Sequence, residues 1–162
     1  GLVRVYLASL QQCIDAKIWP AAVCLALTLP EMAGAVESPE LEVRQRYAKW
    51  FDQWVGEKYR TSLLSGTRRF LSGADCYALK CAVLYQDVDA RSFSSDARGY
   101  ILNRYCFTSK PEDHCIHKGG VLQLSMGSFC QDVLTGCEAW LSAAENDPRK
   151  VARLKARLGS IG

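Results

Sequence analysis

The sequence predicts a mainly α-helical protein, a helical bundle with one short antiparallel β-hairpin in its C-terminal half. Two observations favour this fold class. Over most of the chain, apolar residues recur at steps of three and four, which is the period of one face of an α-helix. From Gly99 onward, YILNRYCF is rich in aromatic and β-favouring residues, and VLQLSM alternates apolar with polar residues as half-buried strands do. We expect a single domain over residues 1–162, because this length suffices for one continuous core.

Three helices are expected in the first third of the chain. The first begins near Val3 and ends near Trp19, and Pro20 suits the first position of the second. The second runs through AAVCLALTL, which is apolar almost all round and should therefore lie at the centre of the bundle, with a kink or a restart at Pro30. The third begins at ESPELE, where Ser38 is the predicted N-cap.

The most clearly marked helix lies within Phe70–Asp87. Ser72 is its predicted N-cap, and Asp75 follows three residues later, in the first turn, where an acidic residue suits the helix dipole. Polar side chains are few on this helix. Asp75, Lys80 and Tyr85 stand five residues apart, so each successive pair is rotated by about 140° around the axis. We therefore expect them to border one opening on the helix surface rather than to form a strict stripe.

The second half of the chain adds the hairpin and two helices. DVDARSFSSDARG, rich in Asp, Ser and Arg, predicts an exposed loop. Two strands joined by SKPEDHCIHKGG then form the predicted hairpin, at about residues 99–126. A major helix follows over Phe129–Ala144, and a basic C-terminal helix at about 148–158 carries five basic residues and no acidic one.

The composition is that of an ordinary globular protein, with 49% hydrophobic and 23% charged residues. A net charge of +3 is mildly basic and does not by itself indicate nucleic-acid binding. Leu2–Leu10 contains Arg4 and lacks the long apolar core of a secretion signal, and no stretch approaches the ~20 apolar residues of a membrane span. We therefore expect a cytoplasmic protein with no membrane partner.

The eight cysteines are expected to be reduced thiols. Six of them lie in helix-patterned apolar segments, where cysteine behaves as a small hydrophobic residue: Cys13, Cys24, Cys76, Cys81, Cys130 and Cys137. His114, Cys115 and His117 are residue types that bind zinc, but their spacing matches none of the strong zinc patterns and a fourth ligand is missing. We predict no metal and no cofactor, and leave metal binding by these three residues open.

The segment ADCYALKCAVLYQD resembles the motif helix of HEPN-domain proteins, and it also resembles EDCYALRCALLHEG from a group of bacterial proteins. WPAAVCLALTLPE, YAKWF and VLQLSMGSFCQDV extend the second resemblance over most of the chain. HEPN domains are small, all-helical bacterial and archaeal domains, many of them endoribonucleases with an Arg-x4-His motif. Asp75 matches the acidic position of these segments. Lys80 occupies the position of the motif arginine, and Tyr85 occupies the position of the motif histidine. The resemblance implies a HEPN-like bundle, a homodimer, and a role in toxin–antitoxin or phage-defence systems.

The two departures from the motif change the expected chemistry. Lys80 offers a point charge that still holds a phosphate, where arginine would offer a forked donor. Tyrosine has a reference pKa of ~10, so Tyr85 is a poor general base near neutral pH. The sequence therefore favours a non-catalytic HEPN-like module that binds RNA or a protein partner. Two alternatives stay open: a metal-independent endoribonuclease that uses Lys80 with Asp75, Tyr85 or a hairpin histidine, and a plain protein-interaction subunit.

A basic cluster precedes the motif helix. Lys58, Arg60, Arg68 and Arg69 occur without an acidic residue between them, and the segment leads directly to the cap at Ser72. Backbone amides at a helix N-terminus beside arginines favour anions, so these five residues are the predicted site for RNA or an acidic partner. A solvated loop without a ligand is the alternative.

Overall fold

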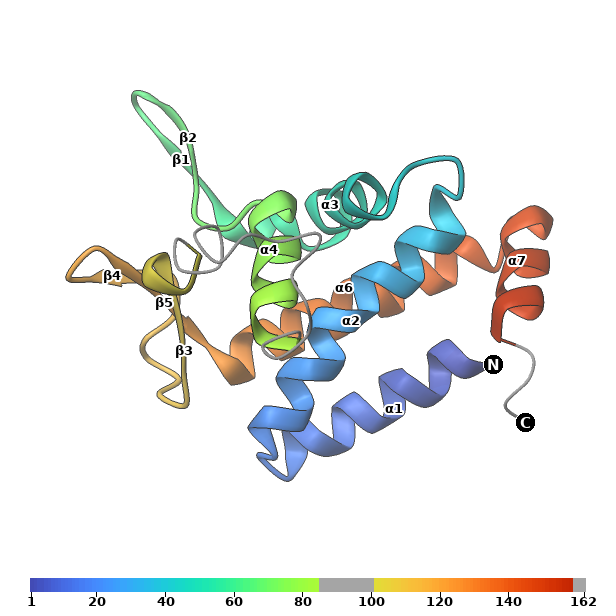
Figure 1. Ribbon diagram of the computed structural model, residues 1–162, viewed down its shortest axis with the longest axis horizontal. Helices are drawn as coiled ribbons and strands as arrows, with labels where there is room; N and C mark the ends of the chain where they lie inside the picture. The colour runs from blue at the N-terminus through green and yellow to red at the C-terminus, as the bar shows by residue number, and fades with distance from the viewer. Residues whose placement is uncertain (85–100, 159–162) are drawn as a thin grey trace.

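A computed structural model describes residues 1–84 and 101–158 of the chain. The fold is mainly α-helical with a short hairpin, as predicted (Figure 1). The elements in chain order are α1 (Leu2–Asp15), α2 (Trp19–Glu37), α3 (Val43–Trp54), the 3-10 helix η1 (Gly56–Tyr59), β1 (Arg60–Leu63), β2 (Gly66–Arg69), α4 (Gly73–Leu84), β3 (Tyr105–Thr108), β4 (Ile116–Lys118), β5 (Val121–Ser125), α6 (Met126–Ala144) and α7 (Pro148–Leu158).

Helix α2 is the centre of the bundle, as its apolar sequence predicts. It packs against α1, α3, α4 and α6, and Figure 1 shows it running across the middle of the molecule. Pro30 lies inside the helix, which continues to Glu37 without a restart. The predicted N-cap for the third helix was wrong for this reason. Ser38 is the C-cap residue of α2, where its amide donates to the carbonyl of Gly34 at 2.9 Å, and α3 begins at Val43.

By length and composition, α2 could also cross a membrane, with a mean hydropathy of 1.4 over an 18-residue window. The expectation that no stretch of the chain is long and apolar enough to span a membrane was therefore wrong. In the fold, 56% of that window is buried against other helices. A central core helix passes the same test of length and composition, because it has to be apolar on most of its faces.

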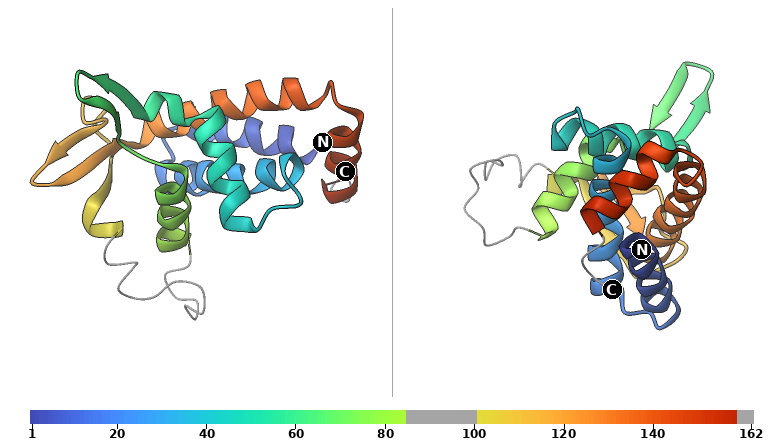
Figure 2. Two further views of the ribbon diagram at one scale, coloured as in Figure 1. Left: turned by 90° about the horizontal axis from the view of Figure 1, so that it is seen from above. Right: turned by 90° about the vertical axis from the view of Figure 1, so that its right-hand side faces the viewer.

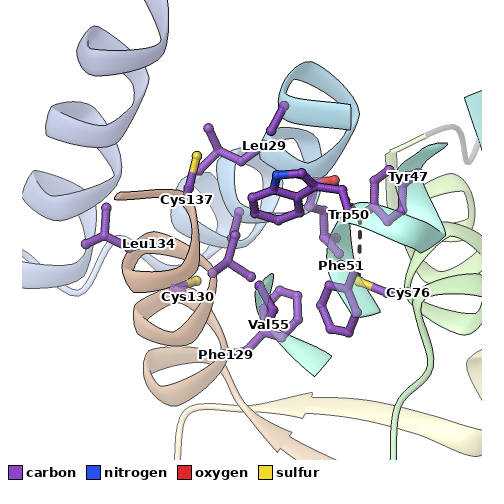
Figure 3. Packing of buried hydrophobic residues seen from close by; sticks show 14 of the residues in the cluster. Leu29, Tyr47, Trp50, Phe51, Val55, Cys76, Phe129, Cys130, Leu134 and Cys137 are labelled. Carbon is purple, nitrogen blue, oxygen red and sulfur yellow. Dashed lines mark hydrogen bonds between the residues drawn. The ribbon is translucent and has the colours of Figure 1, made fainter. Parts of the chain in front are cut away.

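Aromatic side chains of α3 fill the space between α2 and α6 (Figure 3). Trp50 of α3 and Trp140 of α6 pack edge to face with ring centroids 6.3 Å apart, and both are almost completely buried. Tyr47 donates its hydroxyl to the carbonyl of Leu27 at 2.8 Å, which satisfies the buried polar group. Gly73 permits α3 and α4 to touch, since a Cβ there would lie 2.2 Å from the carbonyl oxygen of Ala48.

The C-terminal sheet contains the predicted hairpin, but with a different pair of strands. Residues 101–104 are helical, so the first expected strand shortens to β3. β3 pairs with β5 in parallel, and the antiparallel partner of β5 is β4. The reason is the turn at Gly119 and Gly120, whose φ angles of +58° and +79° form the two-residue connection that a tight hairpin requires.

A second hairpin, β1–β2, was not predicted. It protrudes from the bundle at the same end of the molecule as β4 and β5 (Figures 1 and 2). Nearly all of its residues are exposed. A strand that buries neither face has no alternation of apolar and polar residues, and its sequence resembles a loop.

Candidate nucleic-acid interface

The helix that contains Asp75 and Lys80 is α4 (Gly73–Leu84), and side chains of the protein itself cap its N-terminus. The Asp75 amide donates to the Ser72 hydroxyl at 3.0 Å, which confirms the predicted cap. The Gly73 amide donates to the Asp52 carboxylate at 2.8 Å. Since Asp52 already places an anion at this helix end, Ser72 does not form part of an open anion site. The site predicted from the basic cluster thus loses its helix-terminal component.

Lys80 lies in the core rather than on a ligand-facing surface. Only 2% of the residue is exposed, and its ammonium lies 2.5 Å from the Glu31 carboxylate on α2. The ammonium also sits 4.7 Å from the centre of the Tyr77 ring and 5.8 Å from that of Tyr47. A carboxylate and two aromatic faces compensate a buried cation. The observed contacts of Lys80 are those of a structural ion pair between α2 and α4.

Asp75 and Lys80 serve different interfaces. Asp75 accepts a hydrogen bond from the Tyr105 hydroxyl at 2.7 Å, which links the first turn of α4 to β3. Lys80 pairs with Glu31 of α2, so the two side chains take part in different contacts. Tyr85, the third predicted catalytic position, lies outside the described residues. In the part of the chain that is described, the motif positions contribute packing and not a shared site.

The basic residues gather instead on the β1–β2 hairpin, which we call the basic hairpin and define by Arg60, Arg68 and Arg69. Arg60 is directly opposite Arg69 in the antiparallel register, so the two side chains lie on the same face of the ribbon. Arg68 is opposite Thr61, one position along, and therefore lies on the other face. All three arginines are exposed. The basic hairpin thus carries positive charge on both faces.

On one face, the basic hairpin contacts the neighbouring β4–β5 hairpin. Arg68 Nη2 lies 3.1 Å from His117 Nδ1, and the Arg68 guanidinium lies 5.4 Å from the centre of the Phe70 ring. The rings of Phe70 and His117 are 6.5 Å apart. This arrangement of guanidinium, imidazole and phenyl groups places flat, stackable surfaces beside the arginine charge.

The three arginines have no carboxylate partner among the described residues, whereas the lysines around them do. The ion pairs of the described chain include Lys58 with Asp132 at 3.4 Å and Lys118 with Asp113 at 2.6 Å, and none involves an arginine of the basic hairpin. Lys58 is therefore directed towards α6, and the predicted anion-binding set reduces to the three arginines.

A polar cluster that the sequence did not indicate anchors the base of the hairpin to α6. The Tyr59 hydroxyl donates to Asp132 at 2.9 Å, and His114 Nε2 lies 3.7 Å from the same carboxylate. The amide of Ser125 donates to His114 Nδ1 at 3.1 Å. These residues come from η1, the loop before β4, the end of β5, and α6, so no short motif could have revealed the cluster.

The cluster changes the protonation of its members. Hydrogen bonds to Asp132 and then to Cys115 raise the pKa of His114 to about 9, and burial acts against them. The Ser125 amide also acts against protonation, because Nδ1 accepts a hydrogen bond only when it carries no proton. Burial alone would raise the pKa of Asp132, but hydrogen bonds from His114 and Tyr59 and the charge of Lys58 lower it. Asp132 is therefore ionised at neutral pH.

The histidines and cysteines do not form a metal centre within residues 1–84 and 101–158, where no group of three or more potential ligands gathers. His114 is held by Asp132 and Ser125, and His117 is beside Arg68 on the exposed hairpin. All eight cysteines are free thiols.

Comparison of the chain with protein-family models, with curated proteins and with solved structures found no match.

Proposed function

We propose that this protein is a non-catalytic, HEPN-like module that binds RNA, and that the basic hairpin is its RNA-contacting element. The observation that carries the proposal is the set of three exposed arginines on a protruding ribbon, without carboxylate partners in the described chain. Like charges placed directly opposite on a ribbon destabilise it, and an anion between Arg60 and Arg69 relieves this repulsion. Phosphate oxygens suit this role, because guanidinium groups bind them in a bidentate manner.

The shape of the ribbon supports RNA as the anion. Arg60 and Arg69 share one face of the ribbon and can contact backbone phosphates there, whereas Arg68 lies on the face that contacts the β4–β5 hairpin. The flat groups of Arg68 and His117 offer stacking surfaces for unpaired bases. These contacts are mostly to the backbone, and we expect weak dependence on base sequence.

The non-catalytic part of the proposal rests on Asp75 and Lys80. Lys80 is buried against Glu31, and Asp75 is engaged by Tyr105, so neither is presented to a phosphate in the described structure. A homodimer, a cytoplasmic location and a role in toxin–antitoxin or phage-defence systems belong to the same proposal, on the strength of the resemblance alone. Light scattering that shows a monomer at high micromolar concentration would remove the homodimer.

A binding assay with two charge-matched variants tests the proposal. The hairpin variant carries Arg60→Gln, Arg68→Gln and Arg69→Gln. The control variant carries Lys49→Gln, Lys110→Gln and Lys155→Gln, three exposed lysines elsewhere on the surface. Each variant loses three positive charges from a net charge of +3 and becomes formally neutral, so a difference between them reports position and not total charge.

Fluorescence polarisation with a labelled RNA that contains single-stranded and paired regions is the readout. We expect the hairpin variant to bind at least tenfold more weakly than the wild type, and the control variant to bind within about threefold, since each lost phosphate contact removes a backbone interaction. Equal affinity of the two variants would refute the role of the hairpin. RNA cleavage by the wild type that is lost in Lys80→Ala would instead support the endoribonuclease alternative.

A protein partner is the second candidate, and the tip of the same hairpin favours it. Leu63 is 50% exposed and Leu64 is fully exposed, although burial of a leucine is worth about 2 kcal/mol. An apolar tip above three arginines suits an acidic surface with an apolar pocket. Leu64→Ser should leave RNA affinity unchanged and abolish binding to such a partner, which separates the two candidates.

A further inference from the structure

The β1–β2 hairpin carries two hydroxyl groups beside its opposed arginines, on the same face of the ribbon. Arg60 is directly opposite Arg69 in the antiparallel register, and Ser62 is directly opposite Thr67. Side chains two positions apart along a strand share a face, so Ser62 lies on the same face as Arg60. The same spacing places Thr67 on the face of Arg69. We call this the polar face of the ribbon, and it is made of one guanidinium pair and one hydroxyl pair.

The polar face is open to a ligand. All four of its residues are exposed, and the ribbon protrudes from the bundle (Figures 1 and 2). Within residues 1–84 and 101–158, neither hydroxyl has a hydrogen-bond partner in the protein. The opposite face differs, because Arg68 contacts His117 there at 3.1 Å. A ligand that lies along the polar face can therefore use both kinds of group.

The spacing of the two pairs suits neighbouring groups of an RNA backbone. Strand residues rise by about 3.3 Å each, so the hydroxyl pair lies roughly 7 Å from the arginine pair, towards the tip of the ribbon. In RNA, each ribose is bonded to its phosphates and carries its 2′-hydroxyl beside them. A phosphate held by the arginine pair therefore brings the 2′-hydroxyl of an adjoining ribose within reach of the hydroxyl pair. DNA offers the same phosphates but has no hydrogen-bonding group at the 2′ position.

Serine and threonine hydroxyls match the 2′-hydroxyl chemically. Each donates one hydrogen bond and accepts others, and the 2′-hydroxyl is likewise both donor and acceptor. We propose that Ser62 and Thr67 bind the ribose 2′-hydroxyl and so give the hairpin a preference for RNA over DNA. This inference rests on the proposed function, because the arginines have to hold the nucleic acid first. The arginines supply affinity for any phosphate backbone, and the hydroxyls select the sugar.

Oligonucleotides that differ only at the 2′ position test the inference on the wild-type protein. Fluorescence polarisation measures the affinity for one base sequence as RNA, as DNA that contains deoxyuridine, and as RNA with 2′-fluoro riboses. The 2′-fluoro group cannot donate a hydrogen bond but keeps an RNA-like sugar conformation, so it separates the hydroxyl contact from the shape of the backbone. We expect RNA to bind at least about fivefold more tightly than either analogue, which corresponds to the loss of one or two hydrogen bonds.

Two variants assign the preference to the hydroxyls. The double variant Ser62→Ala, Thr67→Val removes both hydroxyls and keeps every arginine. It should lose affinity for RNA but not for DNA, so that the two bind within about twofold of each other. Thr61→Val is the matched control, because it removes a hydroxyl from the opposite face, and it should keep the wild-type preference. Circular dichroism checks that both variants keep the fold.

Two results would overturn the inference. One is equal affinity of the wild type for RNA and DNA, and the other is an RNA preference that is unchanged in the double hydroxyl variant. Either result leaves the proposed function in place if the Arg60→Gln, Arg68→Gln, Arg69→Gln variant still loses affinity for RNA. Equal RNA affinity of the wild type and this arginine variant would instead refute the proposed function, and the inference with it.

Discussion

The burial of Lys80 gives the sharpest prediction about stability. Lys80→Ala removes an ammonium that lies 2.5 Å from the Glu31 carboxylate and 4.7 Å from the centre of the Tyr77 ring. Removing one partner of a buried ion pair costs about 3–5 kcal/mol, because the other charge is left uncompensated. The Glu31 side chain is 34% exposed and keeps contact with water, which places the expected loss at the lower end, about 3 kcal/mol.

Urea unfolding followed by circular dichroism measures this loss. For a chain of this size, about 3 kcal/mol corresponds to a decrease in Tm of roughly 6–12 °C. Lys80→Met also leaves Glu31 unpaired but keeps the apolar stem, so it should cost at least about 1 kcal/mol less than Lys80→Ala, which in addition leaves a cavity. Lys49→Ala, at an exposed position, is the control and should change stability by less than about 0.5 kcal/mol. If Lys80→Ala matched this control, Lys80 would not be a buried structural residue.

Two further predictions concern pH and packing. Because the folded-state pKa of His114 is raised to about 9 from an unfolded value of ~6.5, its contribution to stability is complete below pH ~6.5 and is lost as the pH rises towards 9. This loss of stability with rising pH should be absent in His114→Gln. A titration midpoint of His114 at or below ~6.5, measured by NMR, would contradict the prediction. Gly73→Ala should destabilise the fold by about 1–3 kcal/mol, because its Cβ would meet the Ala48 carbonyl at 2.2 Å, whereas Gly127→Ala meets only the edge of the Trp19 ring at 3.3 Å and should cost less. Equal unfolding free energies for the two glycine variants would show that α3 and α4 have room to separate.

Local patterns predicted the parts of the fold that depend on neighbouring residues. The cap at Ser72 is confirmed by its hydrogen bond to the Asp75 amide, and the basic C-terminal helix is α7, Pro148–Leu158. The central place of α2 follows from its almost wholly apolar sequence. In each case, the signal lies within a few residues of the element that it predicts.

Contacts between distant residues could not be predicted in the same way. From the sequence alone, Lys80 has the character of a surface lysine, because its partner Glu31 lies 49 positions earlier in the chain. The pairing of β3 with β5 depends on the Gly119–Gly120 turn, which gives β5 a nearer antiparallel partner in β4. Asp132 could not be assigned to a site from sequence, because its partners Tyr59 and His114 come from two other parts of the chain.

The salt dependence of RNA binding tests the role of the basic hairpin most directly. For single-stranded RNA, each neutralised phosphate contributes about −0.7 to the slope of the logarithm of the binding constant against the logarithm of salt concentration. Three arginines should therefore account for a slope of about −2. We predict that the Arg60→Gln, Arg68→Gln, Arg69→Gln variant loses this part of the wild-type slope, and that the charge-matched lysine variant keeps it. The same slope in wild type and hairpin variant would show that RNA, if bound, contacts another surface.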